Sequence, residues 1–315
     1  MAAFVLRRIF MSIIVIILVT LIVFLLQQLV PGGDPARAML GLDASQEEVD
    51  ALRQELWLDK PIMTQYVHWV TNALQGDLGK SLRYRLPISG LIAKRLPITL
   101  HLASLAMIIS VFFGVLGGVV CAVKRGSFID QAISVLANGA VAVPIFWLGI
   151  LGIYFFSLNL GWLPTQGYTS PAENFILNTK QIIMPVICMS LPSMALLTRQ
   201  TRSSMLEVVR QDYIRTAWSK GLTQRNVIIR HALKNALIPI VTLLGLSVPH
   251  LFAGSVLVES VFNIPGMGRL LVNGVLDKDF IVVQACVLLI ALVISLSNLI
   301  VDIAYGWLDP RIRYQ

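Results

Sequence analysis

The sequence predicts an all-α integral membrane protein, and three observations lead to this fold class. Of the 315 residues, 56% are hydrophobic and only 13% are charged, and the mean hydropathy is +0.77. This composition is too apolar and too poor in charge for a soluble domain of the same length. Six apolar stretches are each long enough to cross the roughly 30 Å hydrocarbon core of a bilayer as a helix. Because unpaired backbone polar groups cannot face lipid, each stretch must be helical.

The six predicted transmembrane helices span residues 9–30, 100–123, 131–158, 182–198, 236–260 and 280–303. Arg7 and Arg8 before the first helix resemble the start of a secretory signal. However, the apolar run is longer than a signal core, and VPGG at 30–33 is not a small-x-small cleavage site. We therefore predict that the first helix is retained. Prolines in or near the helices predict kinks: Pro144, Pro185, Pro192, Pro239 and Pro249.

The distribution of Lys and Arg predicts the orientation. Six spans place both termini on one side of the membrane, together with the short loop at Lys124 and Arg125 and the loop at 199–235. This side holds more than half of the basic residues, and most of the others lie in the long 31–99 segment, where the positive-inside rule is weak. Both termini are therefore predicted to be cytoplasmic.

The 31–99 segment is predicted to be helical and extracytoplasmic. Ser45 and Glu48 form an S-x-x-E capping box, followed by apolar residues at helical spacing, Val49, Leu52 and Leu56. A second helix is expected to begin at Pro61 and to end at Gly76. Its expected apolar stripe is Met63, Tyr66, Val67, Val70 and Leu74. These helices either pack against the membrane spans or receive something delivered from outside.

Few polar features lie inside the predicted spans. Gly114 and Gly118 form a G-x-x-x-G pattern that permits close helix packing. Glu259 is expected near an outer end and Asp302 near an inner end, where Arg311 or Arg313 would neutralise it. No chain of carboxylates or histidines crosses the midplane, which argues against an ion-coupled secondary transporter.

The sequence gives no support for an enzyme. Residues 79–81 read GKS, as at the end of a phosphate-binding loop, but position 74 is Leu rather than Gly and no strand is predicted before it. Cys121, Cys188 and Cys286 lie in apolar spans without the spacing of metal ligands, and we interpret them as small buried side chains. His101 and His250 are interpreted as packing or hydrogen-bonding residues.

A polar stretch within the 199–235 loop is the most informative part of the sequence. From Leu206 onward the apolar residues fall on one helical stripe, whereas Arg210, Arg215 and Lys220 point elsewhere. Gly221 is predicted to end this short amphipathic helix as its C′ residue, and Thr223 to cap the next helix, which leads into the fifth span. We expect two helices that meet at a glycine corner, with no flexible joint before the membrane.

The simplest interpretation is a basic loop that obeys the positive-inside rule and lies on anionic lipid. That interpretation does not explain why Tyr213, Ile214, Ala217 and Trp218 precede a tight turn. A helix inserted into a groove of a partner and joined stiffly to moving spans requires such a construction. Nucleic-acid binding is disfavoured because the basic patch is short and fixed at the membrane.

This loop resembles the cytoplasmic coupling loop of ABC importer permeases, in the form found in the dipeptide/oligopeptide/nickel family. The resemblance rests on DYIRTA at 212–217, KGL at 220–222 and RHALKNALIP at 230–239. Arg215, Thr216 and Ala217 stand where the general loop motif has Glu-Ala-Ala, and Gly221 holds the glycine position. By this resemblance, the residues that couple to an ATPase are Asp212, Tyr213, Ile214, Arg215, Thr216, Ala217, Trp218, Lys220 and Gly221.

Further motifs extend the resemblance over nearly the whole chain and indicate the first of two permease subunits. They are GDP at 33–35, LDKP at 58–61, GDLGKS at 76–81, RLPITL at 95–100, GWLP at 161–164, VESVF at 258–262, PGMGRL at 265–270 and DPRIRY at 309–314. The resemblance implies a type I ABC importer permease fold. It divides the chain into an N-terminal transmembrane helix at 1–30, an extracytoplasmic segment at 31–99 and a five-helix core at 100–315 that contains the coupling loop.

The resemblance also implies the partners, all at a prokaryotic inner membrane. They are a second homologous permease that forms a heterodimer, two ATP-binding subunits that hold ATP and Mg²⁺, and an extracytoplasmic substrate-binding protein; this chain itself has no cofactor. The expected cargo is a di- or oligopeptide, with glutathione, opines, nickel and metal chelates as alternatives. The absence of a His or Met cluster argues mildly against bare nickel. Three alternative functions from other classes remain: a secondary transporter, a channel and an assembly scaffold.

Overall fold

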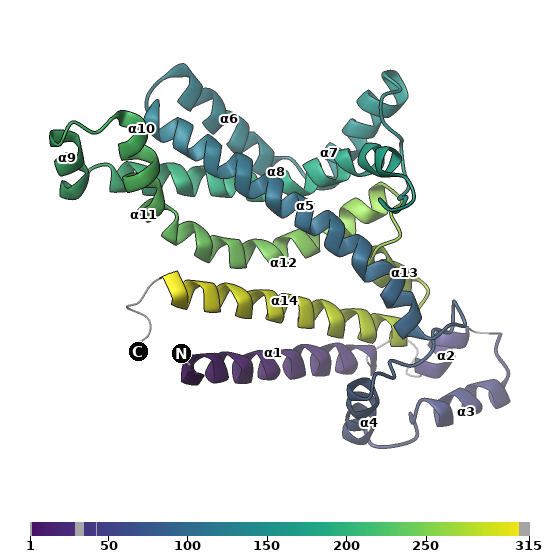
Figure 1. Ribbon diagram of the computed structural model, residues 1–315. Helices are drawn as coiled ribbons and strands as arrows, with labels where there is room; N and C mark the ends of the chain where they lie inside the picture. Colours follow the sequence, from purple (N-terminus) through teal and green to yellow (C-terminus); the bar gives the residue numbers. More distant parts are fainter. Residues whose placement is uncertain (1, 29–34, 42, 309–315) are drawn as a thin grey trace. The chain divides into compact units, whose positions relative to one another are not determined.

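The protein is almost entirely helical in the computed structural model, which describes residues 2–28, 35–41 and 43–308 (Figure 1). Within these residues, extended pairing is limited to one isolated bridge between Lys80 and Pro87. The chain forms two compact units. Unit 1 comprises Met1–Val5, Thr99–Ile264 and Leu296–Gln315, and unit 2 comprises Leu6–Ile98 and Pro265–Ser295. The predicted features VPGG, DPRIRY, Arg311 and Arg313 lie outside the described residues.

The helices are distributed over the two units as follows. Unit 2 holds most of α1 (Ala2–Gln28), together with α2 (Pro35–Leu40), α3 (Gln46–Glu55), α4 (Ile62–Leu74) and α13 (Met267–Leu276). Unit 1 holds α6 (Phe128–Ala142), α7 (Ile145–Gly152), η1 (Ile153–Asn159), α8 (Phe175–Val208), α9 (Asp212–Ser219), α10 (Gln224–Asn226), η2 (Val227–Leu233), α11 (Lys234–Ala236) and α12 (Ile238–Val261). Two long helices, α5 (Ile88–Val123) and α14 (Phe280–Leu308), contribute residues to both units.

Five described helices are long and apolar enough to cross a membrane, namely α1, α5, α8, α12 and α14. A sixth span exists if the pair Phe128–Ala142 and Ile145–Asn159, which is bent by 102°, counts as one. The span predicted at 131–158 with a kink at Pro144 is therefore a sharply bent pair of helices and not one gently kinked helix. Val143 is extended, with φ −91° and ψ 128°, because the ring of Pro144 disfavours the helical conformation of the residue before it.

Several helices extend beyond their predicted ends. α5 begins at Ile88 rather than at residue 100, and α8 covers Phe175–Val208 rather than 182–198. Hydropathy detects only the part of a helix that matches lipid, so polar helical turns beyond that part escape it. Pro185, Pro192 and Pro249 remain inside continuous helices.

The glycine pair on α5 permits close packing against α8, as predicted. A Cβ atom at Gly114 would lie 2.8 Å from the Cβ of Leu197, and one at Gly118 would lie 2.5 Å from the Cβ of Thr201. Any side chain at either position would force the two helices apart.

The helices of the 35–98 part of unit 2 match the sequence prediction in position. Ser45 caps α3 with the full capping box, and these hydrogen bonds from its backbone and side chain lower the pKa of Glu48. α4 follows Pro61 and ends before Gly76, which has φ +86°. Of the predicted apolar stripe on α4, Met63, Val67 and Leu74 are exposed within the fold. Its buried residues are Gln65 and Tyr66.

Polar contacts connect distant parts of the chain within unit 2. The hydroxyl groups of Thr20 on α1 and Tyr66 on α4 are 2.8 Å apart. Ser81 Oγ donates to Asp279 Oδ2 at 2.6 Å, and Asp279 is 2% exposed. An apolar core lies between α5, α13 and α14 and comprises Ile88, Leu91, Ile92, Met267, Leu270, Val282, Ala285 and Cys286. The 35–98 segment is therefore anchored by buried contacts of its own unit.

Candidate functional site

The amphipathic helix predicted in the 199–235 loop is α9. It begins after Gln211, includes Asp212 in its first turn, and is followed by Lys220 as the C-cap residue. Gly221 comes next with φ +74°, and its N–H donates to the carbonyl of Trp218 at 2.9 Å. A Cβ atom at Gly221 would meet nothing within 4 Å. Glycine is therefore required for the left-handed backbone conformation and not for space, which agrees with its predicted place at C′.

One face of α9 is anchored in the protein. Ile214 is fully buried and Ala217 is 6% exposed. They belong to a cluster of buried residues that we name the α9 cluster: Met205, Ile214, Ala217, Val227, Ala232 and Ala236. Val119 and Ala122 of α5 pack against this cluster. The short helix is thus held by contacts with α8 and α5 as well as by its chain connections.

The α9 surface beside and opposite this buried stripe is open. Tyr213 is 43% exposed and Trp218 is 44% exposed, although both carry large apolar rings. The side chains of Arg215 and Asp212 are also exposed, with Arg215 Nη1 at 3.5 Å from Asp212 Oδ1. A surface pair of this kind contributes little to stability. Two exposed rings beside charged residues on one short helix form a surface suited to a protein groove.

Asn235 fixes the orientation of Tyr213, and the sequence reasoning did not single it out as a site residue. Its Nδ2 donates to the Tyr213 hydroxyl at 2.8 Å and also to the carbonyl of His231 at 3.1 Å. The phenol is thereby tied to the helical segment that leads back to the membrane. The spacing from Tyr213 to Asn235 has no periodic meaning, so only the folded corner brings the two residues together.

The chain between Gly221 and α12 is helical from Gln224 onward but not uniform. Thr223 precedes α10 as predicted, yet its side chain makes no capping hydrogen bond. η2 is a π-helical segment, and Leu237 forms a turn between α11 and α12. Figure 1 shows that α12 runs in a different direction from the segment that contains α10 and α11. Pro239, in the first turn of α12, has no N–H to continue the hydrogen-bond ladder across the turn.

An ion pair joins α6 to α8, and it was not predicted from the sequence. The Nε and Nη2 atoms of Arg202 each donate to a carboxylate oxygen of Asp130 at 2.8 Å. Gly126 N–H donates to the same carboxylate at 2.9 Å, and the Asp130 side chain is only 5% exposed. Two parallel bonds from a guanidinium fix distance and direction together. The S-x-x-D spacing of Ser127 and Asp130 is a sequence signal for a helix start, but nothing in the sequence points to Arg202.

Two further pairs of polar side chains contact each other in unit 1. Thr99 Oγ1 donates to the buried Glu259 at 2.6 Å, and His101 Nδ1 lies 2.9 Å from the Tyr168 hydroxyl. Burial raises the pKa of Tyr168. Among the described residues, no group of three or more His, Cys, Asp or Glu side chains is arranged to hold a metal ion.

Comparisons with known proteins place the chain among transport proteins. Residues 114–314 match the family model of the binding-protein-dependent transport system inner membrane component, and residues 1–103 match the N-terminal model of the same transport systems. A probable peptide ABC transporter permease protein of Sinorhizobium fredii is 41% identical over 314 residues, which cover 100% of both chains. The glutathione transport system permease protein GsiC of Escherichia coli is 40% identical over 315 residues, again covering 100% of both chains.

The fold is similar to that of a solved transporter. One chain of the inward-facing MetNI methionine ABC transporter aligns with a TM-score of 0.58 at 16% identity, and the alignment covers 70% of this chain and 96% of that one. The family resemblance inferred from the coupling loop is confirmed. The chain belongs to the binding-protein-dependent transport system inner membrane component family, and it is a multi-pass permease and not an ATPase.

Proposed function

We propose that this chain is the first of two permease subunits of an ATP-driven peptide importer and that α9 is its coupling helix. The observation that carries the proposal is that α9 is buried along one stripe and carries exposed rings on both sides of it. Ile214 and Ala217 are anchored in the α9 cluster, whereas Tyr213 and Trp218 remain exposed. We assign the contact with the ATPase to Asp212, Tyr213, Arg215, Thr216, Trp218 and Lys220. Ile214, Ala217 and Gly221 hold the helix in place.

The proposed assembly has six spans in a type I importer arrangement, with α6 and α7 forming the third span. Both termini and α9 face the cytoplasm, and the 31–99 segment faces the outside. A second permease completes the translocation pathway, two ATP-binding subunits supply ATP and Mg²⁺, and an extracytoplasmic binding protein delivers the cargo. The family description, which names a binding-protein-dependent system, supports this set of partners.

In the proposed mechanism, closure of the ATPase pair moves α9, and contacts rather than the chain connection transmit the motion. The α9 cluster joins α9 to α8 and α5. Asp130 and Arg202 join α8 to α6, and the glycine contacts join α8 to α5. The chain connection from α9 to α12 passes through η2 and the turn at Leu237, and its backbone is less regular than a continuous α-helix. A ligand-driven switch requires contacts that differ between the two states. The contacts between α9 and the ATPase would be of this kind.

Peptides are the proposed cargo because the relatives named above are described as permeases for peptides and for glutathione. Glutathione is the second candidate, since one full-length relative carries that description at 40% identity. Uptake of labelled dipeptide, glutathione and Ni²⁺ into vesicles that contain the complete transporter separates these cargoes. Uptake without ATP, or without the ATP-binding subunits, would instead support a secondary transporter.

The coupling role is tested by Ala217→Asp in the same vesicles, with ATP hydrolysis and dipeptide uptake measured together. Burial of an unpaired carboxylate is strongly unfavourable, so we expect about a tenfold or larger loss of peptide imported per ATP, equivalent to about 1.4 kcal/mol or more. Ala172→Asp, at an exposed loop position, is the matched control and should change little.

Two further variants cover the case in which Ala217→Asp does not fold. Gly221→Pro removes the φ of +74° that the corner needs, and Trp218→Ala removes an exposed ring without opening the core. Each should be inserted in the membrane and uncoupled. An unchanged ratio of uptake to hydrolysis in all three variants would rule out α9 as the coupling helix.

A further inference from the structure

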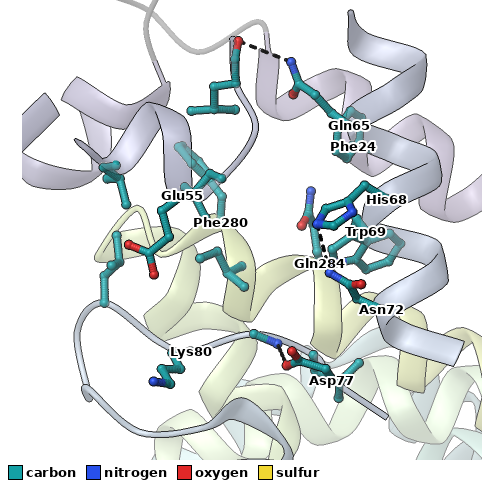
Figure 2. A pocket seen from close by; sticks show the side chains of 17 residues that line it. Phe24, Glu55, Gln65, His68, Trp69, Asn72, Asp77, Lys80, Phe280 and Gln284 are labelled. Atoms are coloured by element: carbon teal, nitrogen blue, oxygen red, sulfur yellow. Dashed lines mark hydrogen bonds between the residues drawn. The ribbon is translucent and has the colours of Figure 1, made fainter. Parts of the chain in front are cut away.

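Unit 2 contains a cavity of about 340 Å³ that has no role in the mechanism proposed above (Figure 2). Its walls come from the end of α3 and the turn that follows, from one side of α4, from the loop at 77–82, from the start of α14 and from Phe24 of α1. Sites for small molecules usually measure about 300–1,000 Å³. The cavity therefore has room for a ligand of the size of a short peptide.

The inner part of the cavity is apolar, with one polar group that lacks a partner. Phe24 and Leu52 are buried there, and Phe280 lines it from α14. Trp69 also lines the cavity, and its indole Nε1 is buried with no hydrogen-bond acceptor. A buried N–H without an acceptor is unfavourable. The site is therefore suited to a ligand that pairs an apolar group with a carbonyl or carboxylate oxygen.

The α4 wall is fixed before any ligand arrives. The His68 ring stacks on Trp57, with ring centroids 3.9 Å apart and an interplanar angle of 10°. His68 Nε2 also lies 3.1 Å from Asn72 Nδ2. Figure 2 shows His68, Trp69 and Asn72 together on this wall. A wall with fixed side chains reduces the entropy lost on binding.

The mouth of the cavity carries both signs of charge. Glu55 and Lys80 line it, and both residues are exposed. Figure 2 shows the two side chains across the cavity from the α4 wall, with a space between the carboxylate and the ammonium group. In the part of the chain that the structure describes, neither side chain has an ion-pair partner. This arrangement is complementary to a zwitterion.

We propose that this cavity binds a short zwitterionic peptide with an apolar side chain. The peptide ammonium group pairs with Glu55, its carboxylate pairs with Lys80, and a backbone carbonyl accepts from Trp69 Nε1. The side chain occupies the space beside Phe24 and Phe280. The choice of a peptide rests on the proposed function, but binding here involves no residue of α9 and no ATPase.

The test uses the full chain in lipid nanodiscs without nucleotide, and leucyl-leucine is the probe. Binding is followed by calorimetry and by tryptophan emission, since Trp69 lines the cavity and Trp57 stacks on the lining residue His68. We expect saturable binding of leucyl-leucine. N-acetyl-leucyl-leucine amide, which lacks both charges, should bind about tenfold or more weakly, and glycylglycine should also bind more weakly.

Three variants identify the contacts. Glu55→Gln and Lys80→Gln should each weaken the binding of leucyl-leucine about three- to tenfold, because exposed charges contribute modestly. Neither variant should change the affinity for the blocked peptide. Trp69→Phe should weaken the binding of both the free and the blocked peptide. The matched controls are Glu47→Gln on the exposed surface of α3, Lys94→Gln on α5 and Trp162→Phe, none of which lines the cavity. Thermal unfolding of each variant shows whether the fold is retained.

Several results would overturn the proposal. They are the absence of saturable binding to the folded chain, equal affinity for the free and blocked peptides, and unchanged affinity in the two charge variants. Saturable binding of phosphoethanolamine in place of the peptide would assign the site to a zwitterionic lipid headgroup. Because the assay contains no ATPase, a negative result here leaves the coupling test unaffected, and a failed coupling test leaves this assay unaffected.

Discussion

α1 and α8 are both long enough to span a membrane, yet they differ in what surrounds them. The most apolar stretch of α1 is only 11% buried within the fold, whereas that of α8 is 61% buried. α1 is also the more apolar of the two. α8 contains Pro185, Pro192 and Arg202 and still forms one helix. The helix with the stronger hydropathy signal is thus the one with fewer partners inside the chain.

The difference shows that hydropathy measures contact with lipid and not structural importance. α1 leaves most of its surface exposed within the fold, and Thr20 and the Ile17 carbonyl contact the Tyr66 hydroxyl of α4. α8 uses its surface for protein, since it meets the glycines of α5, the carboxylate of α6 and the α9 cluster. Helices in a bilayer associate through close packing and polar contacts, and these require small or polar residues that lower the hydropathy. Substitutions should therefore have much larger effects on α8 contacts than on α1.

The largest effect is expected at the contact between α5 and α8. In Gly118→Leu, the Cβ atom alone would lie 2.6 Å from the carbonyl oxygen of Thr198, so we expect a loss of about 4 kcal/mol or more, or no folded protein. Gly139→Leu on α6 is the matched control, because a Cβ there meets nothing within 4 Å. Thermal unfolding in detergent measures both. Equal stability of the two variants would show that this contact is not close in the protein.

A medium effect is expected for the pair between α6 and α8. Arg202→Met leaves the Asp130 carboxylate with Gly126 N–H, and should cost about 2–3 kcal/mol. This is below the full value for a buried pair because the Arg202 side chain is 34% exposed. Adding Asp130→Asn should recover part of the loss, which a double-mutant cycle detects. The same cycle on the exposed pair of Asp212 and Arg215 is the control. Strictly additive losses of unfolding free energy at Asp130 and Arg202 would contradict a direct interaction.

The smallest effects are expected on α1. Thr20→Val removes the contact with the Tyr66 hydroxyl and should cost about 1 kcal/mol of unfolding free energy. Leu18→Ala, at a side chain that is 51% exposed within the fold, should cost less than about 0.5 kcal/mol. Both are measured by denaturant titration in micelles. A larger loss for Leu18→Ala than for Thr20→Val would mean that another chain covers this face.

Much of the architecture could be predicted from local patterns. The capping box at Ser45 and the C′ glycine at 221 fix helix ends through bonds within a few residues, and such bonds are visible in the sequence. The break before Pro144 was expected only as a kink in one span. Its size depends on the packing of the two halves, which the sequence does not show.

The contacts around α9 could be predicted only in part. The apolar pattern predicted an amphipathic helix, but it did not separate the buried Ile214 and Ala217 from the exposed Tyr213 and Trp218. The pairing of Asn235 with Tyr213 did not follow from any pattern. Arg202 was counted among basic residues of a loop, although it lies inside α8 and binds a carboxylate 72 residues away. Long-range pairs depend on which helices meet, and no local rule of spacing contains that information.

The bond between Ser81 and Asp279 has a consequence for the construction of chimeras. It links residues 198 positions apart in sequence and lies in the same unit as the cavity. Grafting the 31–99 segment alone from a relative would separate a buried acid from its hydroxyl donor. Exchange of that segment should succeed only when the stretch between α13 and α14 is inherited with it, so the two pieces form one transplantable module.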